Sequence, residues 1–190
     1  MTRDPYWNHN TQYHPWLLRQ APSGGSALDI GCGDGLLARK LAGPCASVLG
    51  VDLDGAILET APTAANVEYR QGDFRELDGT FDYVTAVATV HHVPLAEGFA
   101  ALRRLVAPGG VLAVVGLWKM SPRQDFHYLP LIPAIRVIDL LRGGKNDPQV
   151  VVRDADETLG QIRTAAREYL PGAAIRRRLM WRYTLLWRNV

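Results

Sequence analysis

Cysteine is scarce in this sequence: Cys32 and Cys45 are the only two among 190 residues. Two cysteines supply neither a disulfide framework nor a quartet of metal ligands, which excludes a disulfide-stabilised secreted domain and a structural zinc site. We therefore expect no bound metal, and we expect the protein to work in a reducing compartment, the cytoplasm.

Long apolar runs are missing as well. The longest apolar strand-like run, residues 111–118, is far shorter than the ~20 residues that a membrane-spanning helix requires. The start of the chain, MTRDPYWNHN, lacks the apolar stretch of a signal peptide. These absences predict a protein that neither enters a membrane nor is exported.

The sequence has no large excess of charge of either sign. Its formal net charge of +2 is too small to attract nucleic acids or acidic membranes in general, so a basic function would need clustered residues. Such a cluster occurs near the C-terminus, where residues 176–178, Arg182 and Arg188 are arginines interleaved with aromatic residues. These arginines could contact nucleic acid or could protect a sheet edge from aggregation. We favour the second interpretation.

Strand-like and helix-like segments alternate along the chain. Apolar residues make up 47% of the sequence and charged residues 21%, which is typical of a globular protein, and the length fits one domain, residues 1–190. The alternation predicts an α/β fold with a doubly wound, mostly parallel sheet and helices on both faces. The predicted strands are 27–30, 47–51, 66–71, 81–90 and 111–117, and the helices between them are 36–41, 56–61 and 95–106.

The segments outside this alternation are less regular. Residues 13–20 are expected to form a short helix, and residues 119–154, with four prolines, are expected to be an insertion rather than a sheet unit. A helix over 155–169 follows, and the tail over 173–189 predicts a pair of antiparallel strands.

The clearest motif is ALDIGCGDG, which ends at Gly35. Glycines at the point where a buried strand turns into a helix let the backbone approach a ligand, and the helix start offers free amides to an anionic group. A dinucleotide fold would place glycine at position 36, but Leu36 stands there, and the spacing is G-x-G-x-G. The motif therefore argues against a nicotinamide or flavin cofactor.

Aspartates recur at the ends of the first three predicted strands. Asp52 follows Asp29 by 23 residues, and Asp73 follows Asp52 by 21. Each interval fits one strand, one helix and the return, so the three side chains should gather at the carboxyl edge of the sheet, where open α/β sheets bind ligands. A carboxylate such as Asp52 can accept from both hydroxyls of a ribose, and one such as Asp73 from an adenine amino group.

The glycine loop and the aspartates together resemble class I, Rossmann-like methyltransferases that use S-adenosylmethionine (SAM). The segments FDYVTAVATVHHV and LRRLVAPGGVLAVVGLW extend this resemblance over residues 28–118. It implies a seven-stranded sheet with a C-terminal antiparallel hairpin strand, and SAM as cofactor with S-adenosylhomocysteine (SAH) as product. The cofactor-binding residues that it implies are Asp29, Gly31, Gly33, Gly35, Asp52, Leu53, Gly72, Asp73, Phe74, Ala88 and Tyr13.

Each stretch of the single domain has an expected part. Residues 1–26 would form an N-terminal lid helix and linker, although ordinary packing explains their aromatic residues equally well. Residues 27–118 would bind the cofactor, and 119–154 would cover the substrate, with Asp125 and His127 as possible contacts. Residues 155–190 would complete the sheet.

Three histidines are candidate catalytic residues. His91 and His92 follow the fourth predicted strand, beside the expected position of the transferable methyl group, where a neutral imidazole could take a proton from the acceptor. Each could instead only pack or hydrogen-bond the loop. His14, in the N-terminal helix, is the third candidate.

We expect methyl transfer to an oxygen, nitrogen or carbon nucleophile of a small organic molecule, of the kind made in secondary metabolism, by a monomer or homodimer. The fourth strand ends in ATVHHV rather than the N-P-P-Y type sequence of enzymes that methylate the exocyclic amines of nucleic-acid bases. The alternatives are a SAM-binding protein without methyl transfer, such as an isomerase, cyclase or regulator, a methyltransferase acting on RNA or protein, and a non-enzymatic nucleotide-binding or RNA-binding module.

Overall fold

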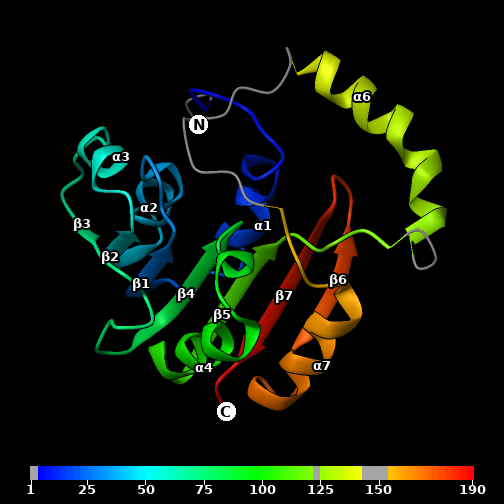
Figure 1. Cartoon of the computed structure of the whole chain (residues 1–190). Coiled ribbons are helices and arrows are strands. Elements are labelled where there is room, and N and C mark those ends of the chain that lie inside the picture. Colours follow the sequence, from blue (N-terminus) through cyan, green and yellow to red (C-terminus); the bar gives the residue numbers. More distant parts are fainter. Residues whose placement is uncertain (1–3, 122–124, 143–153) are drawn as a thin grey trace.

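The chain forms a seven-stranded mixed sheet with the order β3-β2-β1-β4-β5-β7-β6 (Figure 1). A computed structural model describes residues 4–121, 125–142 and 154–190. The strands are β1 (Gly24–Ile30), β2 (Cys45–Asp52), β3 (Val67–Gln71), β4 (Phe81–Val87), β5 (Val106–Gly116), β6 (Ala174–Arg178) and β7 (Arg182–Arg188). Strands β1 to β5 run parallel, and β7 pairs antiparallel with both β5 and β6. The predicted doubly wound sheet with a C-terminal antiparallel hairpin is confirmed.

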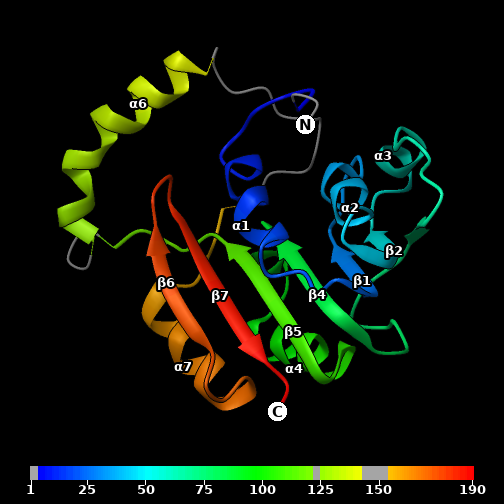
Figure 2. The ribbon, with the colours of Figure 1, turned by 180° about the vertical axis from the view of Figure 1, so that it is seen from behind.

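Helices cover both faces of the sheet, as Figures 1 and 2 show from opposite sides. The helices of the described residues are α1 (His14–Leu18), α2 (Leu36–Leu41), α3 (Gly55–Glu59), α4 (Leu95–Leu105), α6 (Ile132–Leu141) and α7 (Leu159–Tyr169). Leu17 of α1 and Leu41 of α2 pack into one core. Phe99 of α4 and Ile162 of α7 pack into the core on the opposite face. The central strands are therefore buried on both sides, which explains their nearly continuous apolar sequences.

The limits of several elements differ from the predicted ones. The fourth strand ends at Val87 rather than at residue 90, because Ala88 takes a left-handed backbone conformation with φ 53° and a 3-10 turn, Val90–His92, follows. The C-terminal helix begins at Leu159, where the Thr158 side chain caps it. A 3-10 turn, Thr11–Tyr13, precedes α1. Turn and cap contacts thus set limits that apolar periodicity does not show.

The expected insertion is described only in part. Its described residues form a 3-10 turn, Phe126–Leu131, and the helix α6, with no strand among them, and Figure 1 shows α6 standing apart from the sheet. The side chain of His127 lies outside the described part. Asp125 is buried and pairs with Arg177 of β6 at 2.9 Å. In the described ranges, no helix is both long and apolar enough to cross a membrane.

Three of the C-terminal arginines make contacts within the protein. Besides Arg177, Arg178 donates to the hydroxyl of Thr184 at 3.0 Å, and Arg182 donates to the Asn10 side chain at 2.9 Å. These contacts stabilise the terminal hairpin and join it to Asp125 and Asn10, which agrees with a structural role for the arginine cluster.

A glycine to alanine pair tests the packing of the sheet. Gly116 ends β5 opposite Tyr183 of β7, and a Cβ added at Gly116 would overlap the buried Tyr183 ring. We expect Gly116→Ala to lower the free energy of unfolding by about 1–3 kcal/mol, because a packed core resists extra atoms. Chemical denaturation measures the change.

The control is Gly160→Ala on the exposed side of α7, where the added Cβ meets only a 3.8 Å contact. Alanine there should raise the free energy of unfolding by about 0.5–1 kcal/mol, because glycine in a helix costs more backbone entropy. Equal effects of the two substitutions would contradict the packing described for Tyr183.

Candidate active site

A cavity of about 390 Å³ opens at the carboxyl edge of the sheet. The strand order turns from β1 toward β2 on one side and toward β4 on the other, and this switch point is where open α/β sheets bind ligands. The lining contains ten of the predicted site residues: Asp29, Gly31, Gly33, Asp52, Leu53, Gly72, Asp73, Phe74, Ala88 and His92. Gly35, His91, Tyr13 and His14 are not among the lining residues.

The glycine loop joins β1 to α2 with three left-handed residues: Gly31 at φ 67°, Gly33 at φ 54° and Gly35 at φ 73°. A Cβ on Gly31 would overlap the hydroxyl of Thr89, and a Cβ on Gly35 would overlap the phenol of Tyr69. Gly31 and Gly33 border the cavity, whereas Gly35 directly precedes α2. The close approach at Gly35 is therefore to the protein's own side chain rather than to a ligand.

Asp52 at the end of β2 holds the glycine loop in place. Its Oδ2 accepts from the backbone N–H of Gly33 at 2.8 Å, and its Oδ1 accepts from the N–H of Asp54 at 3.0 Å. A carboxylate offers about four lone-pair sites, so Asp52 retains acceptor capacity toward the cavity. Leu53, next to it, has 65% of its surface exposed and offers an apolar surface at the cavity edge.

Asp29 is the most buried charged group of the site, with 2% of its surface exposed. Its Oδ1 accepts from the Thr85 hydroxyl of β4 at 2.9 Å, and its Oδ2 has no hydrogen-bond partner among the described residues. Burial raises the pKa of Asp29 to about 7, although the Thr85 hydrogen bond opposes the shift. A cationic group in the cavity would favour the ionised form.

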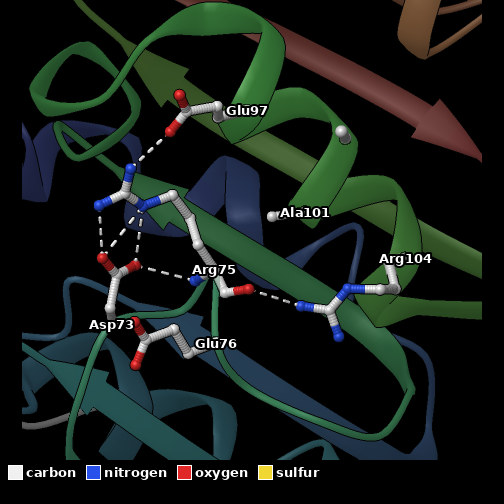
Figure 3. A pocket seen from close by; sticks show the side chains of 7 residues that line it. Asp73, Arg75, Glu76, Glu97, Ala101 and Arg104 are labelled. Carbon is white, nitrogen blue, oxygen red and sulfur yellow. Dashed lines mark hydrogen bonds and ion pairs between the residues drawn. The ribbon is translucent and has the colours of Figure 1, made fainter.

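Asp73 follows β3 and faces the cavity together with Gly72 and Phe74. The guanidinium of Arg75 also donates hydrogen bonds to this carboxylate, with Nη2 2.6 Å from Oδ2 (Figure 3). This hydrogen-bonded pairing lowers the pKa of Asp73. Asp73 therefore stays ionised as an acceptor at the cavity edge.

The two adjacent histidines after β4 differ in their exposure to the cavity. His92 lines the cavity beside Thr89 and Val93, whereas His91 is buried with 9% of its surface exposed. Their rings stack at a tilt, with centroids 4.2 Å apart. Both histidines belong to the 3-10 turn Val90–His92, and of the two, His92 is the one on the cavity lining.

The N-terminal segment forms another wall of the cavity, through Tyr6, Asn8, Asn10 and Thr11. The Tyr6 hydroxyl donates to Asp34 of the glycine loop at 3.0 Å. Sequence reasoning missed the polar members of this wall. The Asn8-x-x-Thr11 spacing is a local signal, because the Asn8 side chain accepts from the Thr11 N–H at 2.8 Å in a turn of the Asx kind.

Two other N-terminal candidates have contacts elsewhere. The Tyr13 hydroxyl donates to the Leu179 carbonyl at 2.6 Å, and burial raises the pKa of Tyr13 to about 12. His14 lies 3.1 Å from Lys40 Nζ, and burial, helped by that cation, lowers the pKa of His14 to about 3. The contacts of both residues fasten the first helix to the body.

A profile of the methyltransferase domain family matches residues 28–114. The chain is 34% identical over 193 residues to an uncharacterized methyltransferase of Mycobacterium bovis, covering 97% of this chain and 98% of the relative. Magnesium protoporphyrin IX methyltransferase from Synechocystis, crystallised with SAH, has the same fold (TM-score 0.63, 20% identity, 95% of this chain and 81% of that one). The chain belongs to the class I SAM-dependent methyltransferases.

One further relative and one further solved structure with this fold extend the comparison. The ubiquinone biosynthesis O-methyltransferase of Thiobacillus denitrificans is 31% identical over 175 residues, covering 72% of this chain and 75% of that protein. The PH0226 protein from Pyrococcus horikoshii shares the fold with a TM-score of 0.69 and 22% identity, over 95% of this chain and 89% of that one.

The cavity of the methyltransferase fits the charge pattern of SAM. The Oδ2 of Asp29, which has no partner in the described parts of the chain, is a buried acceptor suited to the cationic amino-acid end. Asp52 and Asp73 are carboxylates placed at the ends of the next two strands along the sheet, suited to hydroxyl and amino donors of the nucleoside. Among the described residues, no cluster of three potential metal ligands occurs.

The pKa of Asp29 predicts how the stability of the ligand-free enzyme depends on pH. The folded protein keeps this proton up to about pH 7, whereas the unfolded chain loses it near the ordinary aspartate pKa of 3.8. Because the folded state holds the extra proton, this contribution to stability falls as pH rises between those values. Relative to Asp29→Asn, wild-type protein should lose free energy of unfolding from pH 5 to pH 7, as measured by denaturant titration.

Asp82→Asn is the control, because hydrogen bonds from Ser26 lower the pKa of Asp82. Its difference from wild type should stay nearly constant between pH 5 and pH 7. A constant difference for Asp29→Asn as well would mean that Asp29 is ionised throughout this range, contrary to the effect of its burial.

Proposed function

We propose that this enzyme transfers the methyl group of SAM to a hydroxyl oxygen of a small organic molecule, with His92 as the general base. The observation that carries the proposal is the position of His92 on the cavity lining, in the 3-10 turn that follows β4, together with Thr89. A neutral imidazole in that position can accept the proton that an attacking hydroxyl must lose.

The cofactor supplies an electrophilic methyl group on its sulfonium when it is bound. The protein then has to place the acceptor in line and exclude water, which is where most of the rate enhancement of such a transfer arises. Asn8, Asn10 and Thr11 line the cavity with polar groups. Among these, Asn8 and Thr11 are buried, so their orientation is fixed before the acceptor arrives.

The choice of oxygen as the acceptor atom is supported by relatives as well as by His92. The similar protein of Thiobacillus denitrificans is named an O-methyltransferase of ubiquinone biosynthesis, and a hydroxyl, unlike a neutral amine, is a poor nucleophile until a base assists it. We infer an acceptor small enough to enter beside His92.

Isothermal calorimetry followed by product analysis tests the proposal. We expect SAM and SAH to bind and NAD not to bind, because the loop lacks the spacing of a dinucleotide site. Incubation with methyl-labelled SAM and a panel of phenols, alcohols, amines and carbon acids should label hydroxyl compounds. Binding of SAM with no labelled product from any acceptor would favour a SAM-binding protein without methyl transfer.

Substitution of the two histidines tests the base. We expect His92→Asn to lower kcat by about 10²–10⁴-fold with little change in the Kd of SAH, because general-base assistance has that magnitude. The acidic limb of the pH–rate profile should disappear with it. Steady-state kinetics and calorimetry measure both effects.

His91→Asn is the matched comparison, because its ring is buried behind His92. It should lower the melting temperature and leave kcat close to that of the wild-type enzyme. A His92→Asn enzyme with wild-type kcat and an unchanged pH profile would remove His92 from the reaction.

A further inference from the structure

Asp73 lies on the boundary between two cavities. It belongs to the lining of the cofactor cavity and also to that of an open outer cavity of about 520 Å³ between the loop after β3 and the helix α4. In the described parts of the chain it is the only residue that these two linings share. Arg75, Glu97 and Arg104 line the outer cavity alone (Figure 3).

Arg75 holds the Asp73 carboxylate from the outer side. Three N–H donors of this one residue reach it: the backbone N at 2.9 Å from Oδ1, Nε at 3.1 Å from Oδ1 and 3.0 Å from Oδ2, and Nη2 at 2.6 Å from Oδ2. A carboxylate offers about four lone-pair sites. The Nε hydrogen is shared between both oxygens, so the three hydrogens of Arg75 leave room for one further donor. Because Arg75 does not line the cofactor cavity, that donor would approach from the cavity side.

The guanidinium of Arg75 is itself fixed by α4. Its Nη1 donates to Glu97 at 2.6 Å, and Arg104, two turns along the same helix, donates to the backbone carbonyl of Arg75 at 2.9 Å. A planar guanidinium held at both ends cannot rotate without breaking one of its pairs. The direction of the remaining Asp73 acceptor site is thereby set by α4.

We propose that Arg75, fixed by Glu97, is a positioning residue that makes the cofactor site selective for a 6-amino purine. The proposal rests on the proposed function, with SAM bound in the cavity so that its adenine amino group donates to Asp73. With one ionised acceptor site directed at the ring, an exocyclic N–H donates to it. A 6-oxo purine instead presents an oxygen lone pair to the same carboxylate, which is repulsive.

A second interpretation treats the Asp73–Arg75–Glu97 group only as a clasp between the loop and α4. The two interpretations differ in one measurable quantity. A clasp stabilises the loop for every purine, so its loss weakens all ligands by the same factor. A positioning residue acts on the amino group, so its loss weakens the amino ligand selectively and changes the ratio of affinities.

The test compares SAH with its 6-oxo counterpart, S-inosylhomocysteine, by calorimetry on the full chain. Wild-type enzyme should bind SAH at least about tenfold more tightly, as expected for a hydrogen bond to a charged acceptor. Arg75→Gln should lose most of that preference through weaker SAH binding, with S-inosylhomocysteine binding within about twofold of wild type. Glu97→Gln should show the same change to a smaller degree, and Arg75→Lys should restore part of the preference.

The matched control is Arg70→Gln, which removes an exposed arginine of β3 that pairs with Glu68 at 3.0 Å. It should leave both affinities unchanged. An Arg75→Gln enzyme with an unchanged ratio of the two affinities would overturn the positioning proposal. SAH binding by the wild-type enzyme would in that case still support SAM as the cofactor. Failure of wild-type protein to bind SAH would overturn the proposed function itself and, with it, this inference.

Discussion

The pairing of β1 with β4 is the constraint on which the site depends. These parallel strands lie side by side in the sheet although two helices and two further strands separate them in sequence, and Asp29 stands opposite Thr85 in their register. The buried hydrogen bond between these two side chains, 2.9 Å long, joins the strands just before their carboxyl ends. Beyond it the loops diverge, because one strand leads toward β2 and the other toward β5. The cavity is the space between these loops.

Each loop is then shaped by contacts with its neighbour rather than by its own sequence alone. Gly31 must lack a side chain because Thr89 of the opposite loop occupies that space, and Gly33 is held by Asp52 from the next strand. The carboxylates of the site therefore serve two purposes: they fix the loops, and they present the remaining acceptor sites to the cavity. A ligand site formed in this way is largely organised before anything binds.

The sequence predicted those parts of the site that repeat with the period of the fold. Asp52 and Asp73 were found because a strand, a helix and a return take a nearly constant number of residues. It did not predict that Gly35 accommodates Tyr69, or that Arg75 grips Asp73 and reaches Glu97, because these depend on side-chain packing between separate elements. The predicted end of the fourth strand at residue 90 was also wrong. The strand ends at Val87, because Ala88 turns the backbone although the β-branched run continues past it.

The two sides of the cavity have different physical origins, and this difference bears on what the enzyme accepts. The side at β1, β2 and β3 is built from strand ends that the sheet register fixes. The side at Asn8 and Thr11 is built from a turn held by its own hydrogen bonds and by the contact of Tyr6 with Asp34. Such a turn can change its side chains without disturbing strand pairing. Under the proposed function, the sheet fixes the cofactor and this turn selects the acceptor.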